Sequence, residues 1–75
     1  MKITYKEIDS IRVGDTQFDT AIRTEKDKGE TLTQAVLRIY PSHNAPYYQE
    51  IVLNDWSGIR SFGNALIDLE RKMTE

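Results

Sequence analysis

Few residues in this chain could do acid–base or nucleophilic chemistry. The chain has no cysteine, which excludes disulfides, thiolate nucleophiles and cysteine-ligated metals, and its one histidine, His43, lies in a segment between two prolines. A catalytic triad or a metal site needs several such groups held within reach of one another. The spacing of Gly58 and Gly63 also lacks the Lys-Ser/Thr of a phosphate loop. We therefore expect no enzyme, no cofactor and no metal, with His43 a solvated loop residue.

Aromatic and basic side chains indicate binding rather than catalysis. Four aromatic residues, Tyr40, Tyr47, Tyr48 and Trp56, cluster in a short stretch of the chain. The bases of single-stranded nucleic acids stack on such rings at ~1–3 kcal/mol each, while Lys and Arg neutralise phosphates. The candidate nucleic-acid-binding residues are Arg12, Arg23, Lys26, Arg38, Tyr40 and Tyr48. On one sheet face they would form a basic surface that also carries aromatic rings.

The overall charge leaves a second function open. Ten Lys and Arg against twelve Asp and Glu give a net charge of −2, which is not the basic balance typical of a nucleic-acid binder. A protein-binding module fits that charge, such as a viral or mobile-element regulator or an inhibitor of a host enzyme. The loop from Tyr40 to Tyr48, with Trp56, would then anchor the partner. A continuous basic face favours nucleic acid, and an interspersed one favours a protein partner.

Period-two alternation of β-branched and aromatic residues predicts four strands in the first two thirds of the chain. The first ends at Val13, and the others cover 17–26, 31–40 and 47–53. Gly14-Asp15 and the segment 27–30 have the composition of tight turns, and the two prolines mark 41–46 as a loop. Ile8 interrupts the alternation, which predicts a β-bulge or a short break beside Asp9.

The alternation also predicts which side chains share a face of the sheet. In the third strand, Ala35, Leu37 and Ile39 have one parity, while Arg38 and Tyr40 have the other. In the first strand, Ile3, Tyr5, Ile11 and Val13 have one parity and Lys2, Thr4, Lys6 and Arg12 the other. We expect the face of Arg38 to be joined by basic residues of the neighbouring strands, which are Arg23, Lys26, Lys2, Lys6 and Arg12.

After Leu53 the apolar period changes to that of an α-helix. Apolar residues recur at spacings of three and four, and these are Ile59, Phe62, Leu66, Leu69 and Met73. Asn54 or Asp55 is the expected N-cap, and Arg71 and Lys72 lie in the last turn, where the helix dipole favours cations. Gly63, in mid-helix, predicts a close backbone approach. The sequence thus predicts one α+β domain over residues 1–75: a four-stranded antiparallel sheet followed by one C-terminal amphipathic helix that covers a sheet face (ββββα).

The chain shows no targeting or membrane pattern. Its first residues alternate charged and apolar side chains, unlike a secretory signal. The longest apolar runs, such as Ile51-Val52-Leu53, are far shorter than the ~20 residues that span a bilayer. We expect a cytoplasmic protein that does not contact membranes.

The second half of the chain has a charged strand that ends in an aromatic residue, then a short apolar strand, then the apolar helix pattern. The two strands are Val36-Leu37-Arg38-Ile39-Tyr40 and Glu50-Ile51-Val52-Leu53-Asn54. This order resembles the transcriptional positive-cofactor-four family of small single-stranded-DNA-binding coactivators. The family's loop before the last strand is usually rich in Lys and Gly, whereas Asn44-Ala45-Pro46-Tyr47-Tyr48 has no basic residue. The resemblance implies binding of single-stranded DNA or RNA through Arg38 and Tyr40, with Arg23 and Lys26 on the preceding strand.

The resemblance also implies a homodimer, paired through the terminal helix and the sheet edge. The sequence independently allows this, because a chain of 75 residues buries only ~60% of its unfolded surface. Its helix region also carries apolar or small residues beyond one stripe. The candidate contacts with the second copy or another partner are Trp56, Gly63 and Ile67.

Overall fold

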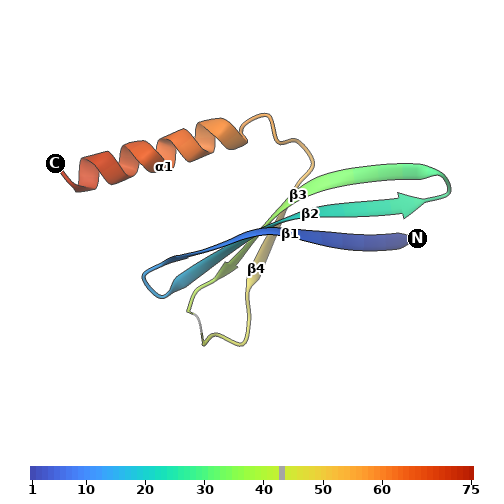
Figure 1. Cartoon of the computed structure of the whole chain (residues 1–75), viewed down its shortest axis with the longest axis horizontal. Coiled ribbons are helices and arrows are strands. Elements are labelled where there is room, and N and C mark those ends of the chain that lie inside the picture. The colour runs from blue at the N-terminus through green and yellow to red at the C-terminus, as the bar shows by residue number, and fades with distance from the viewer. Residues whose placement is uncertain (43) are drawn as a thin grey trace.

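The computed structural model describes residues 1–42 and 44–75, so the prediction made for His43 lies outside the described residues. The chain forms four strands and one helix (Figure 1). The elements are β1 (Lys2–Val13), β2 (Thr16–Asp27), β3 (Glu30–Tyr40), β4 (Gln49–Leu53) and α1 (Ile59–Met73). The sheet is antiparallel throughout, with strand order β1-β2-β3-β4. The predicted ββββα order is confirmed.

Two tight turns set the register of the first three strands. Gly14 adopts a φ of 62° in the β1–β2 turn, and both Lys28 (φ 50°) and Gly29 (φ 84°) have positive φ in the β2–β3 turn. Positive φ at the first or at both central residues is typical of two-residue hairpin turns, whose twist matches the right-handed twist of the flanking strands. These turns pair Val13 with Thr16 and Asp27 with Glu30. Both predicted turns are therefore confirmed.

A β-bulge divides β1 into two halves. The β1–β2 register shifts between Glu7 and Asp9, which is where the alternation breaks in the sequence. Because the extra residue reverses parity, Tyr5 pairs with Arg23 whereas Ile11 pairs with Phe18. The expectation that Ile3, Tyr5, Ile11 and Val13 share a face is therefore wrong. The bulge places Ile3 and Tyr5 on the same face as Arg12.

The two faces of the sheet differ in chemistry. One face, here called the arginine face, carries Tyr5, Arg12, Arg23, Arg38 and Tyr40 with interspersed carboxylates, and its centre is formed by buried Ala21 and Val36. The opposite face, here called the apolar face, carries Ile11, Val13, Phe18, Ile22, Ala35, Leu37, Ile39, Ile51 and Leu53. β4 pairs only with residues 35–39 of β3, so the ends of β1, β2 and β3 beyond Ala35 form a three-stranded extension.

α1 follows the predicted apolar pattern but starts differently. Its N-cap is Gly58, which has no side-chain capping bond, so the expectation of a cap at Asn54 or Asp55 is wrong. Both side chains are used in the preceding segment. The Asp55 carboxylate accepts a bond from the Ser57 backbone N–H at 2.9 Å, and the Asn54 side-chain oxygen accepts one from the Gln34 amide. Arg71 and Lys72 lie in the last turn, as expected.

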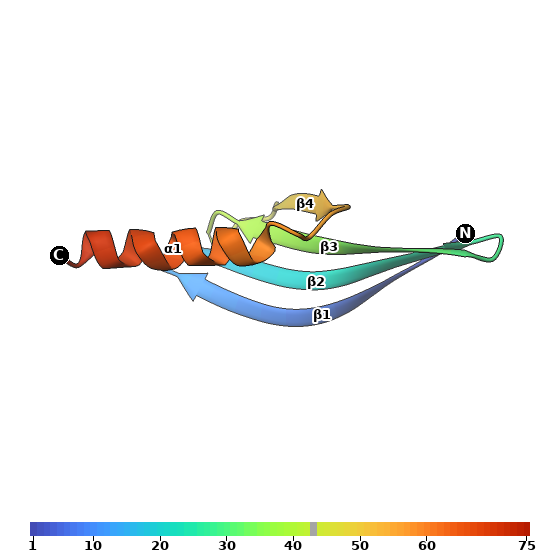
Figure 2. The ribbon, with the colours of Figure 1, turned by 90° about the horizontal axis from the view of Figure 1, so that it is seen from above.

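The helix does not cover the sheet. It extends away from the strands, as Figures 1 and 2 show from two directions, and no Cα atom of α1 lies within 8 Å of a strand Cα atom. The expected packing of the helix on a sheet face is therefore wrong within one chain. Only the first turn approaches the sheet, where Ile59 and Phe62 line a hollow of about 340 Å³ with Leu37, Ile51 and Leu53. The chain is consequently elongated, at 53 × 31 × 15 Å.

No helix in the described part of the chain is long and apolar enough to span a membrane.

Candidate nucleic-acid interface

The strand register places most of the predicted site on one face. Tyr40 of β3 pairs with Gln17, which pairs with Arg12 of β1, so these side chains lie in one row across the sheet. Arg38 lies in the next row, opposite Asp19. Arg23 lies further along the same face, two rows beyond Arg38. The sheet therefore brings Arg12, Arg38 and Tyr40 together.

Lys26 lies on the other face. It pairs with Lys2 and Thr31, whose parity is that of the apolar face, so the expectation that Lys26 joins Arg38 is wrong. Lys6 pairs with Ile22, and both Lys2 and Lys6 have the same orientation as Lys26, so the expectation that these two lysines join Arg38 is also wrong. For Lys26, the reason is that strict alternation along β2 separates Arg23 from Lys26 by an odd number of residues. These lysines form a separate basic end of the apolar face.

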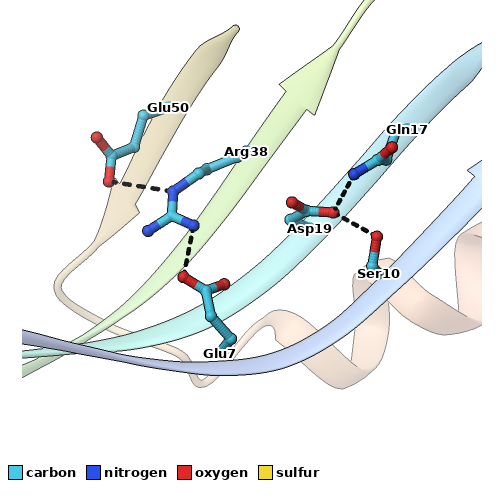
Figure 3. Close-up of polar contacts among 6 residues, drawn as sticks. All are labelled: Glu7, Ser10, Gln17, Asp19, Arg38 and Glu50. Carbon is cyan, nitrogen blue, oxygen red and sulfur yellow. Dashed lines mark hydrogen bonds and ion pairs between the residues drawn. The ribbon is translucent and has the colours of Figure 1, made fainter. Parts of the chain in front are cut away.

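Arg38 is held by carboxylates on both sides (Figure 3). Its Nη1 donates to Glu7 Oε1 at 2.8 Å, and its Nε lies 4.0 Å from Glu50 Oε1. The hydrogen bond to Glu7 is the main cause that raises the pKa of Arg38 above its ordinary value. Its guanidinium carbon also lies 5.0 Å from the Tyr5 ring centre, within cation–π range. Arg38 is thus a fixed cation, with its side chain 13% exposed.

Asp19 is a second ordered charge beside Arg38. Its Oδ1 accepts hydrogen bonds from the Ser10 hydroxyl at 2.7 Å and from the Gln17 amide at 2.9 Å (Figure 3). The bond from Ser10, then that from Gln17 and the charge of Arg38, lower the pKa of Asp19. The carboxylate is therefore ionised at neutral pH and offsets part of the positive charge of the arginine face.

Tyr40 and Tyr48 form an aromatic pair at one end of this face. Their ring centres lie 5.0 Å apart with the planes tilted by 38°, a favourable arrangement for aromatic rings. Tyr48 is 49% exposed and Tyr47 is 67% exposed, so this end of the sheet offers accessible aromatic surface. The predicted clustering of these aromatic residues is confirmed for Tyr40 and Tyr48.

Arg23 belongs to a different polar network. Its Nη1 donates to the Gln34 side-chain oxygen at 2.6 Å, and its Nη2 lies 3.7 Å from Glu25. Gln34 is buried and in turn donates to Asn54, which links the sheet to the segment that leads into α1. This network stabilises the junction between β4 and α1, so Arg23 has a structural role that the sequence reading missed.

A shallow hollow of about 570 Å³ opens on the arginine face beside the bulge. Arg38 and Tyr40 line it together with Ser10, and its other lining residues are Glu7, Ile8, Asp9 and Asp19. Ile8, which the bulge leaves without a partner in β2, lines this hollow. Sequence reasoning missed Tyr5, Glu7 and Asp19 as neighbours of Arg38, because a strand pattern gives the face of a residue but not its partner across strands.

The predicted partner contacts lie near the helix. Trp56 is 53% exposed and lines a hollow of about 340 Å³ with Ile22, Ala35 and Ile59. Gly63 meets no atom within 4 Å of the position of a Cβ, so the predicted close backbone approach is not made within the chain. Ile67 is 50% exposed and lies off the apolar stripe.

The described residues contain no group of three His, Asp or Glu side chains arranged as metal ligands. Comparisons with protein-family models, with curated proteins and with solved structures give no match.

Proposed function

We propose that this chain is a non-enzymatic protein that binds single-stranded DNA or RNA on its arginine face, as a homodimer, in transcription or replication. One observation supports this most: an aromatic pair, half-buried Tyr40 and exposed Tyr48, lies at the end of the sheet face that carries Arg38 and Arg12. Aromatic rings that receive bases beside cations that contact phosphates are the two requirements for binding single strands without strict sequence preference. The resemblance to the positive-cofactor-four family supports the same reading.

The carboxylates of this face should weaken the proposed binding of phosphate. Glu7 and Glu50 already pair with Arg38, so a phosphate must compete with them for the guanidinium. We therefore expect modest affinity that falls as salt rises, because phosphate neutralisation contributes to it on a face that is not strongly positive. Removing the competing carboxylate should strengthen binding.

A labelled 20-base oligonucleotide titrated at ~50 and ~200 mM salt tests the proposal. We expect binding at the lower salt that weakens at the higher. Tyr40→Ala should weaken it about 5- to 100-fold through lost stacking, and Arg38→Ala should reduce both affinity and salt dependence. Glu7→Gln should tighten binding, because it releases Arg38. Arg60→Ala, on the helix, makes the same charge change as Arg38→Ala and should have little effect.

One observation favours the second candidate, a protein-binding module. The arginines at the centre of the face are paired with carboxylates, so the basic side chains are interspersed rather than continuous. If wild type binds no oligonucleotide at ~50 mM salt, and Glu7→Gln does not restore binding, the nucleic-acid proposal is wrong and the protein-binding module takes its place.

A further inference from the structure

Two apolar surfaces of the chain have no partner within it. The helix seam, defined as Ile59, Phe62, Leu66, Leu69 and Met73, has residues that are 43–77% exposed. The apolar face of the sheet is uncovered beyond the first turn of α1, and Ile11, Val13 and Ile22 are all exposed there. A helix stripe and a sheet face of this kind are stable only when each is buried against another layer. The single chain satisfies neither.

The solvent-accessible area of the chain can be compared with that of a compact monomer of the same mass. The chain exposes 6210 Å², whereas a folded monomer of 8.7 kDa exposes about 4,700 Å². The excess of about 1,500 Å² per copy corresponds to about 3,000 Å² in a symmetric dimer, which lies in the range of obligate homodimers. The radius of gyration, 14.9 Å, likewise exceeds the ~11 Å of a compact chain of this length. A second copy that covers this excess would bring the exposed area per chain to an ordinary value.

The two surfaces are complementary in kind and in size. The seam has the 3-4 spacing of a helix face that packs on one neighbour, and 15 helical residues span ~22 Å. Strands of 11 or 12 residues span ~36–40 Å, so the sheet can accommodate the helix along its length. In its own chain, only the first turn of α1 approaches this face, and the rest of the helix extends away from the strands (Figure 1). A second copy supplies both missing layers at once.

We propose that two copies exchange their helices, so that the helix seam of each protomer packs on the apolar face of its partner. The contact is reciprocal, as a two-fold dimer requires. The exchange rests on the homodimer of the proposed function, and it is independent of nucleic-acid binding because the arginine face lies on the opposite side of the sheet. Trp56, which lines the hollow between Ile22 and Ile59, lies at the edge of the contact and becomes covered in the dimer.

Sedimentation equilibrium tests the dimer with the intact chain. We expect wild type at 10–100 µM to have twice the 8.7 kDa mass of the chain. Leu69→Asp should make the protein monomeric, because the substitution would bury a carboxylate in the apolar contact. Asn64→Asp is the matched control on the opposite side of α1 and should remain dimeric. Wild type that is monomeric at 100 µM overturns the proposal and leaves these surfaces to another partner.

Disulfide trapping tests the exchange itself, since the chain has no native cysteine. One copy carries Leu66→Cys or Leu69→Cys, and the other carries Phe18→Cys, Ile22→Cys or Ile39→Cys. Mild oxidation of mixed copies should link helix to sheet between chains, because a disulfide forms only where Cα atoms lie about 4.4–6.8 Å apart. Asn64→Cys should form no such link. Disulfides only between two helix cysteines would overturn the exchange, whether or not the protein binds an oligonucleotide.

Discussion

At the scale of single residues, a few polar contacts determine what the arginine face can bind. Arg38 is oriented by Glu7 and stacked over Tyr5, while Asp19 is held by Ser10 and Gln17. The parity of β3 predicted the face of Arg38 and Tyr40 correctly. Their partners could not be predicted, because Glu7 lies next to Arg38 only after two hairpins and a bulge have set the register.

The hydrogen bonds to Asp19 predict a pH dependence of stability. Its pKa in the folded state lies below the unfolded value of about 3.9, so its stabilisation is complete above that value and is lost as pH falls through the folded pKa. Asp19→Asn should lower the free energy of unfolding by about 1 kcal/mol or less at pH 7, and the difference should be smaller at pH 2, where the carboxylate begins to be protonated. Urea unfolding at both pH values measures this.

The control for this prediction is Asp68→Asn, because Asp68 is highly exposed and its one pairing is a surface contact with Arg71. We expect it to match wild type at both pH values. A destabilisation by Asp19→Asn that persists undiminished at pH 2 would show that the carboxylate charge has no part in it.

At the scale of elements, local sequence patterns predicted the strands, the turns and the helix, because these depend on residues that are close together in the sequence. Strand alternation and the two glycine turns gave β1, β2 and β3 to within a residue or two, and the three-four spacing gave α1. The predicted N-cap failed because Asn54 is bonded to Gln34, which is distant in sequence. The prediction that Lys26 lies on the face of Arg38 was wrong because it grouped the basic residues by charge and did not apply the strict alternation of side chains along β2.

Gly63 is the element-scale feature that has no explanation within the chain. In mid-helix a glycine costs ~1 kcal/mol relative to alanine, and no atom lies near enough to require it. It flanks the helix seam, where the partner's sheet would approach the backbone. We expect Gly63→Ala to raise the dimer dissociation constant several-fold by sedimentation, despite its higher helix propensity. A lower dissociation constant would show that Gly63 faces solvent in the dimer.

At the scale of the whole molecule, the sequence predicted the order of elements but not their packing. The apolar stripe of the helix and the apolar residues of β3 and β4 were identified correctly, whereas Ile3 and Tyr5 of β1 lie on the arginine face, and one chain was expected to join helix and sheet. That expectation failed because the segment between β4 and α1, tied to the sheet through Asn54 and Gln34, directs the helix outward. In the proposed dimer, the packing of helix and sheet therefore depends on a second copy, which a pattern read along one chain does not describe.

This arrangement predicts thermal stability that depends on concentration. Because folding and association bury the same apolar surfaces, each tenfold increase in protein adds about 1.4 kcal/mol per dimer. The melting temperature should rise by about 3–5 °C per tenfold increase between ~2 and ~200 µM, followed by circular dichroism. The fluorescence of Trp56, the only tryptophan, should shift to longer wavelength on dilution. A melting temperature independent of concentration would contradict obligate association.

The outward helix also bears on the lifetime of the protein in a cell. A copy without a partner exposes an apolar seam and an apolar face, which are the features that chaperones and proteases recognise. Newly made chains would then survive only when enough copies are present to pair. The abundance of the protein would follow its rate of synthesis more steeply than in direct proportion, so small changes in expression would act as a threshold.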